Sequence, residues 1–294
     1  MARVALILNA HAGGGNGGET AERIVGLYRA AGAEPAVHLA QGDELGALAE
    51  RAVGDGAALV VAAGGDGTIS SVAGALAGTA SALGVIPLGT LNHFARDLGI
   101  PLDLAAAVVT TLEGREQRID AGEVNGRLFL NNSSIGLYPA MVRRRTKQQR
   151  RLGRGKWPAM LWAAHTVLRR HPFMDLTLEL DGVRHRRRTP FVFVGNNVYE
   201  MEGFDIGRRA RLDAGVLSVY VTQRTGRRRL LALALRALAG RLKQARDFEA
   251  ATTAKLRIEG RHKRLLVSTD GEVASFELPL EYRLRPGALR VIAP

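Results

Sequence analysis

Short apolar runs alternate with stretches of helical spacing over the first third of the chain, and this alternation constrains the fold more than any other feature. Residues 58–63 form a continuous apolar run that leads directly into a Gly-rich loop. Such runs are typical of strands buried on both faces of a parallel sheet, with helices packed on them. The pattern predicts an α/β domain over residues 1–120, with strands at 4–8, 35–39, 58–63 and 83–86 and helices at 20–31, 45–53, 68–76, 91–98 and 102–112.

The pattern changes near residue 120, where strand and turn signals replace most of the helices. Asn125-Gly126 and Asp181-Gly182 each lie between two short runs of strand-forming residues, which predicts tight hairpin turns. We expect residues 121–294 to form an antiparallel β-sandwich with one helix at 227–242, the last residues being free to return to the first domain. Strands are predicted at 119–124, 127–131, 176–180, 183–185, 190–194, 217–221, 255–258, 265–268, 273–277 and 289–292.

Charge and cysteine content narrow the functional classes. The 294 residues include 41 Lys and Arg against 28 Asp and Glu, and a net charge of +13 attracts polyanions. The absence of cysteine excludes disulfides, thiolate nucleophiles and Cys-ligated metals. No nucleic-acid-binding module accompanies the charge, so we expect no specific nucleic-acid partner. The N-terminal apolar run is too short for a signal peptide and no run is long enough to span a membrane, so we expect a cytoplasmic protein.

Three Gly-rich turns follow predicted strands of the first domain, at residues 9–15, 64–68 and 89–92. Glycines let successive backbone N–H groups point inward and let the chain approach a phosphate closely. The helix after the second turn would add the partial positive charge of its N-terminus, and Asp66 could hold a magnesium ion or a nucleotide hydroxyl. One such turn alone is more simply an ordinary tight turn. Three at the strand ends of one sheet favour a nucleotide site, although neither a Walker A nor a clear dinucleotide fingerprint is present.

Three motifs together resemble the diacylglycerol kinase catalytic-domain family, which includes bacterial lipid kinases and sphingosine kinases. They are Gly64-Gly65-Asp66-Gly67-Thr68, Pro87-Leu88-Gly89-Thr90-Leu91-Asn92-His93-Phe94-Ala95 and Thr269-Asp270-Gly271-Glu272. The first motif is shared with NAD kinases and phosphofructokinases. The second, followed in the correct order by the third, is much more specific.

The resemblance implies an ATP-binding α/β domain, a C-terminal β-sandwich and transfer of the γ-phosphate of ATP to a lipid hydroxyl, with Mg²⁺ neutralising the phosphate charge. It implies that Asp270 is the general base and Glu272 a metal-binding or orienting partner. From the residues alone, Asp270-Gly271 is an ordinary hairpin turn. The implied nucleotide-binding residues are Asn9, Gly64, Gly65, Asp66, Gly67, Thr68, Gly89, Thr90 and Asn92.

The chain departs from the family pattern at four positions. Ala10, Ala40 and His93 stand where the family commonly has Pro, Thr and Asp. Many members also bind a structural magnesium through an Asp-Asp-Gly turn, and here Asp213 is followed by Ala214. Asp213 is therefore a metal ligand only by resemblance, at a site that lacks one expected acid.

A basic run at residues 143–156 contains no acid and is followed by Trp157 and Trp162. Basic residues beside tryptophans suit an anionic membrane surface, where each charge contributes about 1 kcal/mol. A solvated cationic loop leading into a core helix explains the run equally well. The first reading predicts peripheral binding to the inner face of the membrane.

Three functions remain open from the sequence. The leading one is an ATP-dependent lipid kinase acting on a diacylglycerol-like or sphingoid-like hydroxyl. A kinase for NAD shares the first motif, and a lipid- or nucleotide-binding module without turnover would account for the departures. Neither the acceptor lipid nor the oligomeric state is encoded in a recognisable motif.

Overall fold

The computed structural model describes residues 4–12, 16–136, 173–199, 209–222 and 248–294. The chain divides into two compact units. The first contains Met1–Ala121, Arg127–Asn131 and Arg285–Pro294, and the second contains Gly122–Gly126 and Asn132–Leu284. The basic run at 143–156, the tryptophans after it and the predicted helix at 227–242 lie outside the described residues.

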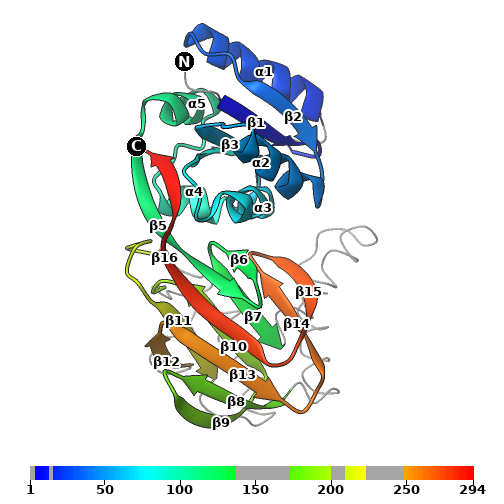
Figure 1. Cartoon of the computed structure of the whole chain (residues 1–294), viewed down its shortest axis with the longest axis vertical. Helices are drawn as coiled ribbons and strands as arrows, with labels where there is room; N and C mark the ends of the chain where they lie inside the picture. The colour runs from blue at the N-terminus through cyan, green and yellow to red at the C-terminus, as the bar shows by residue number, and fades with distance from the viewer. Residues whose placement is uncertain (1–3, 13–15, 137–172, 200–208, 223–247) are drawn as a thin grey trace, which may run out of the picture. The chain divides into compact units, whose positions relative to one another are not determined.

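A parallel sheet covered by helices forms the first unit (Figure 1). Its strands lie in the order β2-β1-β3-β4, and the end of β16 adds a parallel strand beside β4. The elements are β1 (Val4–Asn9), α1 (Gly17–Ala30), β2 (Ala36–Ala40), α2 (Glu44–Gly54), β3 (Leu59–Gly64), α3 (Asp66–Leu76), β4 (Ala82–Pro87), α4 (His93–Asp97), α5 (Leu104–Glu113), β5 (Arg115–Val124) and β6 (Arg127–Phe129), the last residues of β5 belonging to the second unit.

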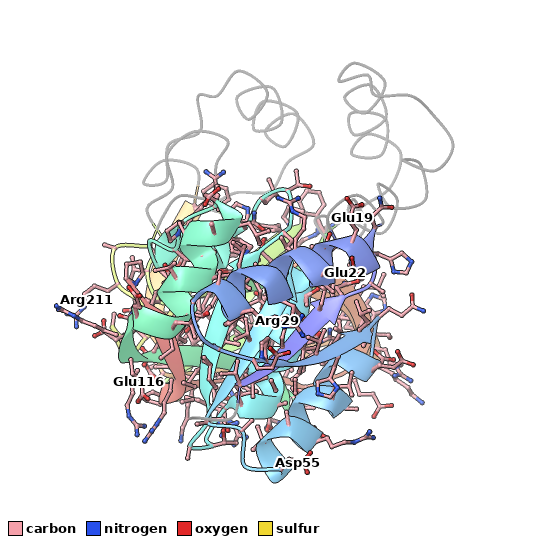
Figure 2. All side chains as sticks on the ribbon, turned by 90° about the horizontal axis from the view of Figure 1, so that it is seen from above. Glu19, Glu22, Arg29, Asp55, Glu116 and Arg211 are labelled. Carbon is pink, nitrogen blue, oxygen red and sulfur yellow. The ribbon has the colours of Figure 1, made fainter. Side chains whose placement is uncertain are left out.

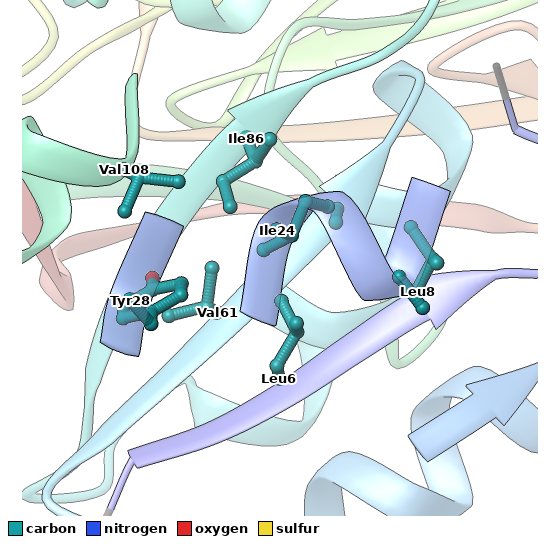
Figure 3. Packing of buried hydrophobic residues seen from close by; sticks show 9 residues of the cluster. Leu6, Leu8, Ile24, Tyr28, Val61, Ile86 and Val108 are labelled. Atoms are coloured by element: carbon teal, nitrogen blue, oxygen red, sulfur yellow. The ribbon is translucent and has the colours of Figure 1, made fainter. Parts of the chain in front are cut away.

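The core of the first unit joins α1 and α5 to one face of the sheet (Figure 3). Ile24 and Tyr28 of α1 are fully buried because helical spacing brings them to the same side, while Glu22 and Arg29 point to solvent (Figure 2). The Tyr28 hydroxyl lies 2.6 Å from Thr111 Oγ1, and burial raises the pKa of Tyr28 to about 12. The other buried members of this cluster are Leu6, Leu8, Ala21, Val61, Ala63, Ile86 and Val108.

Antiparallel strands in two sheets form the second unit. One sheet has the order β12-β11-β10-β7-β14-β15, and the other contains β16, β13, β8 and β9 in that order. Alternating residues of β13 and β16 are buried, including Leu256, Ile258 and Tyr282, as expected of strands with one face in a core. The strands are β7 (Asn132–Gly136), β8 (Met174–Leu180), β9 (Val183–Thr189), β10 (Phe191–Asn196), β11 (Leu217–Thr222), β12 (Phe248–Thr253), β13 (Lys255–Gly260), β14 (Arg264–Thr269), β15 (Glu272–Glu277) and β16 (Leu280–Ala293).

The structure confirms the predicted fold class, a parallel α/β unit followed by an antiparallel β unit. Both predicted hairpin turns are present, and φ is positive at both residues of Asn125-Gly126 and of Asp181-Gly182. Two strands that the sequence pattern did not predict are β7 and β12. Within the ranges that the structure describes, no helix is long and apolar enough to cross a membrane.

Candidate active site

The three predicted Gly-rich turns, the first of them described only over residues 9–12, begin at one edge of the parallel sheet. β1 ends at Asn9, β3 ends at Gly64 and β4 ends at Pro87, and these three strands are direct neighbours. The register pairs Leu8 with Ala63 and Gly64 with Pro87, so the three strands end at the same level. Carboxyl ends of parallel strands are where α/β sheets bind ligands.

A side-chain hydrogen bond joins the first turn to the second. Asn9 Nδ2 donates to Thr68 Oγ1 at 3.0 Å, and Asn9 Oδ1 accepts the backbone N–H of His11 at 3.0 Å. Thr68 is buried in the first turn of α3. Asn9 and Thr68, which are far apart in sequence, therefore hold β1 and α3 together at the sheet edge.

The second and third turns approach each other at two glycines. A Cβ placed on Gly89 would lie 2.6 Å from Gly65 Cα, and a Cβ on Gly64 would lie 2.5 Å from Thr68 Oγ1. Neither distance is compatible with a side chain unless the neighbour moves. The glycines at these positions are thus required by close packing of backbone, in addition to any contact with a ligand.

Asn92 closes the third turn on itself. Its Oδ1 accepts the N–H of Gly89 at 2.9 Å and its Nδ2 donates to the carbonyl of Gly89 at 2.8 Å. The residue is buried and adopts a left-handed conformation, with φ of 49°, which Asn tolerates better than most residues. Asn92 thereby fixes the turn, while the neighbouring Thr90 is exposed.

Asp66 connects the second turn to the third through its carboxylate. Its Oδ2 accepts the N–H of His93 at 3.2 Å and its Oδ1 accepts the N–H of Phe94 at 3.1 Å. Asp66 therefore caps the start of α4, a role that the sequence did not suggest. The structure also corrects two helix starts: α3 begins at Asp66 rather than at residue 68, and α4 begins at His93 rather than at residue 91, because Asn92 is left-handed.

The start of α3 offers hydrogen-bond donors at this sheet edge. Gly65 precedes it in an extended conformation, and its N-terminus has no side-chain cap. The N–H groups of Asp66, Gly67 and Thr68 have no carbonyl one turn earlier within the helix. Together with the close-packed glycine turns, these donors form an arrangement suited to an anion such as a phosphate.

Asp270 lies in the second unit, in the turn between β14 and β15. Its φ is 48° and that of Gly271 is 86°, so the local structure is the hairpin turn expected from the residues alone. The turn is tied to β7, because Asp270 Oδ1 accepts the N–H of Asn132 at 3.0 Å and the N–H of Asp270 donates to the Asn132 carbonyl at 2.9 Å. Asn132 was missed because no motif marks it. Glu272 is exposed at the start of β15.

Asp213 is paired with an arginine. Arg211 Nε and Nη2 donate to its two carboxylate oxygens at 3.0 and 3.2 Å, and Arg211 points to solvent (Figure 2). The hydrogen bond from Arg211 holds the pKa of Asp213 below its usual range. The N–H of Ala214 is bound by Asn197 Oδ1 at 2.9 Å. Residues that the structure describes contain no cluster of three His, Asp or Glu side chains able to hold a metal. The metal-binding role of Asp213 stays a prediction.

A pocket with a volume of about 670 Å³ lies elsewhere in the second unit. Two ion pairs line it: Arg283 Nε donates to buried Glu123 at 2.7 Å and Arg257 Nη1 donates to Glu281 at 2.9 Å. Neither Asp270 nor Glu272 lines it, and we assign it no part in the candidate site. Its lining residues are Glu123, Asn125, Gly126, Glu179, Asp181, Gly182, Lys255, Leu256, Arg257, Glu281, Tyr282 and Arg283.

Comparison with known proteins places both units in described families. Residues 3–124 match the model of the diacylglycerol kinase catalytic domain. Residues 134–293, more than half of the chain, match the YegS C-terminal NAD kinase beta sandwich-like domain.

Individual relatives agree with these matches. The chain is 37% identical over 123 residues to a Pseudomonas aeruginosa protein described as "Probable lipid kinase YegS-like", covering 41% of this chain and 40% of that protein. It is 31% identical over 144 residues to a Staphylococcus aureus diacylglycerol kinase, covering 49% of this chain and 45% of that enzyme. The chain thus aligns with less than half the length of these two curated relatives.

Solved structures extend the likeness over the whole chain. A crystal structure of "a putative diacylglycerol kinase" from Bacillus anthracis str. Sterne superimposes with a TM-score of 0.77 at 25% identity, covering 99% of this chain and 97% of that one. A second structure from the same organism gives a TM-score of 0.75 at 23% identity, with the same coverage of both chains, and supports the fold alone. The chain belongs to the family that joins a diacylglycerol kinase catalytic domain to a YegS-type C-terminal β-sandwich domain.

Proposed function

We propose that this protein is an ATP-dependent lipid kinase that transfers the γ-phosphate of ATP to the hydroxyl of a diacylglycerol-like or sphingoid-like lipid. The observation that carries the proposal is the set of linked turns at the edge of the parallel sheet. Asn9 is bonded to Thr68, Gly89 packs on Gly65, and Asp66 holds the start of α4. Such a rigid, Gly-rich surface with helix N–H donors is suited to the phosphates of a nucleotide.

Asp270 is proposed as the general base. Its Oδ1 accepts the N–H of Asn132, which orients the side chain, and a carboxylate is a base of the kind that accepts a proton from a hydroxyl. As the new bond forms between the lipid oxygen and the γ-phosphorus, the bond from that phosphorus to the β–γ bridging oxygen breaks and ADP leaves. The proton of the hydroxyl passes to the Asp270 carboxylate. Glu272, two residues further on, is proposed as an orienting partner.

Magnesium would supply neutralisation of phosphate charge. The described residues form no preformed cage of three acidic or histidine side chains, and both oxygens of Asp66 already accept backbone N–H groups. This donor set fits a Mg²⁺ ion that enters with ATP and is held mainly by phosphates and water, as is common for this ion. Peripheral binding to an anionic membrane surface at the cytoplasmic face remains part of the proposal, as the location of the lipid acceptor.

The decisive experiment measures transfer of radiolabel from ATP to lipids in a host extract. We expect Asp270→Asn to lower kcat by a factor of about 10²–10⁴, because the amide keeps the hydrogen bond from Asn132 but is a far weaker base than the carboxylate. The matched control is Asp181→Asn, which places the same change in a turn with nearly the same φ values and should retain activity within about twofold. Full activity of Asp270→Asn would overturn the assignment of the base.

Parallel measurements on the same protein distinguish the other candidate functions. Formation of NADP from NAD, without labelled lipid, would identify a kinase for NAD. Tight binding of ATP and liposomes with no phosphorylated product would identify a binding module. Mass spectrometry of the labelled lipid would then identify the acceptor.

A further inference from the structure

Two serine hydroxyls in the second unit are buried without a hydrogen-bond partner. Ser134 on β7 and Ser268 on β14 have 1% and 2% of their surface exposed, and neither Oγ has a partner among the residues that the structure describes. Burying a hydroxyl without a partner is unfavourable, so native proteins contain few such groups. These two residues are direct cross-strand partners, which places both orphan hydroxyls at one spot in the sheet.

Other hydroxyls nearby in the sheet are bonded. Ser133, the neighbour of Ser134, lies 3.0 Å from the hydroxyl of Tyr282. Ser218 Oγ donates to the carbonyl of Asn197 at 2.6 Å. A general shortage of acceptors in this sheet therefore does not explain Ser134 and Ser268.

The orphan pair lies on the strands that lead to the proposed base. Ser268 precedes Asp270 by two residues, and Ser134 follows Asn132, which donates to Asp270, by two residues. Asp270 lies in the turn just beyond β14, and two residues of chain span at most about 7 Å, so the Cα atoms of Ser268 and Asp270 lie within that distance. A small polar headgroup can bridge that distance between Asp270 and the serines.

Polarity changes across the sheet from this pair. Phe193 on β10 is the cross-strand partner of Ser134, and Tyr220 on β11 is the partner of Phe193. The ring centroids of Phe193 and Tyr220 are 5.8 Å apart, and both belong to a buried aromatic cluster with Tyr199. One row of the sheet thus passes from two adjacent serine hydroxyls to aromatic rings. This order matches the polar head and apolar body of an amphiphile.

We propose that Ser134 and Ser268 form a headgroup subsite that binds a second polar group of the acceptor, beside the hydroxyl that Asp270 deprotonates. The inference rests on the proposed function and adds specificity-determining residues to it. Each serine offers one donor and two lone pairs, so the pair recognises a neighbouring hydroxyl, ester carbonyl or amino group. The preferred acceptor is then a lipid with such a vicinal group, in preference to a simple long-chain alcohol.

The test compares two acceptors in mixed micelles, a diacylglycerol and a long-chain primary alcohol with no second polar group. For Ser134→Ala and Ser268→Ala, we expect kcat/KM for diacylglycerol to fall about tenfold each, with KM for ATP unchanged and a much smaller change for the alcohol. Loss of preference between acceptors is the measured signature. The unfolding midpoint should stay the same or rise, because each change removes an unpaired buried hydroxyl.

Ser133→Ala is the matched control, since it removes a hydroxyl from the residue that immediately precedes Ser134 in the same strand. It should lower the unfolding midpoint, because it leaves the buried Tyr282 hydroxyl without this partner, and it should leave the acceptor preference unchanged. If wild type is active and both Ser134→Ala and Ser268→Ala keep its acceptor preference, the headgroup subsite is wrong while the kinase assignment stands. If wild type labels no lipid at all, the proposed function fails and the inference fails with it.

Discussion

At the scale of single residues, Gly89 shows how tightly the candidate nucleotide site is built. Its Cα faces the backbone of Gly65, and its N–H and carbonyl are both bonded by Asn92. The sequence motifs predicted that these residues lie close together, and the structure brings them into contact. They could not show that Asn92 bonds Gly89 within its own turn, because this depends on a left-handed backbone at Asn92.

Gly89→Ala should therefore weaken ATP binding. The added Cβ would lie 2.6 Å from Gly65 Cα, so one of the two turns must move. We expect KM for ATP to rise at least tenfold and the free energy of unfolding to fall by about 1–3 kcal/mol. Initial rates measure KM for ATP, and urea denaturation measures the free energy of unfolding.

Gly74→Ala is the control for this change. Gly74 lies in α3, the helix that follows the second turn, and a Cβ there meets nothing within 4 Å. Alanine should stabilise the helix by about 1 kcal/mol and leave KM for ATP unchanged. Equal kinetic effects of the two variants would show that close packing at Gly89 is unimportant.

At the scale of elements, strands and helices of the first unit were predictable because they follow apolar periodicity. Their ends were less so. α1 begins at Gly17, three residues before the predicted start, and the prediction missed this turn because it contains glycines that carry no apolar signal. β5 begins at Arg115 rather than at residue 119, and its first four residues were missed because they are exposed and polar. β16 was recognised only near its end, although Leu280, Tyr282 and Leu284 alternate with charged residues as in a half-buried strand.

The short helix α4 depends on a carboxylate from another element, which gives a second prediction. Asp66→Ala should loosen α4 and raise KM for ATP more than it lowers kcat, because the two N–H groups at His93 and Phe94 lose their acceptor. The Asp66→Ala substitution should also accelerate hydrogen exchange at the backbone amides of α4. Asp66→Asn retains one acceptor oxygen and should show a smaller acceleration.

Unchanged exchange in α4, together with a lower kcat alone, would instead assign Asp66 a direct role in the reaction. This outcome would support the prediction from the sequence that Asp66 contacts magnesium or the nucleotide. Measuring exchange and kinetics on the same variants separates the two roles.

At the scale of the whole molecule, the first unit is completed by the end of the chain. Arg285–Pro294 belongs to this unit, and β16 pairs with β4 through Arg290 and Val291. Leu289, Val291 and Ala293 are buried there. A fragment of residues 1–131 should therefore lose about 4 kcal/mol of stability from the missing Leu and Val side chains.

The same fragment with residues 285–294 joined by a flexible linker should unfold at a clearly higher urea concentration. Thermal or urea denaturation of the two fragments provides the comparison. A linked fragment in which Leu289 and Val291 are both changed to Ser is the control for the linker itself. Equal midpoints for the fragments with and without residues 285–294 would show that β16 contributes little to the first unit.

The path of β16 also limits how members of this family can exchange parts. The sequence match to the C-terminal domain runs from residue 134 to residue 293, whereas the second unit ends at Leu284. A chimaera that takes its C-terminal domain from a relative would therefore import a foreign strand into the sheet of the first unit. Recombination between family members should succeed only where β4 and the incoming strand still fit, so the residues that contact each other along β4 and β16 must be exchanged together.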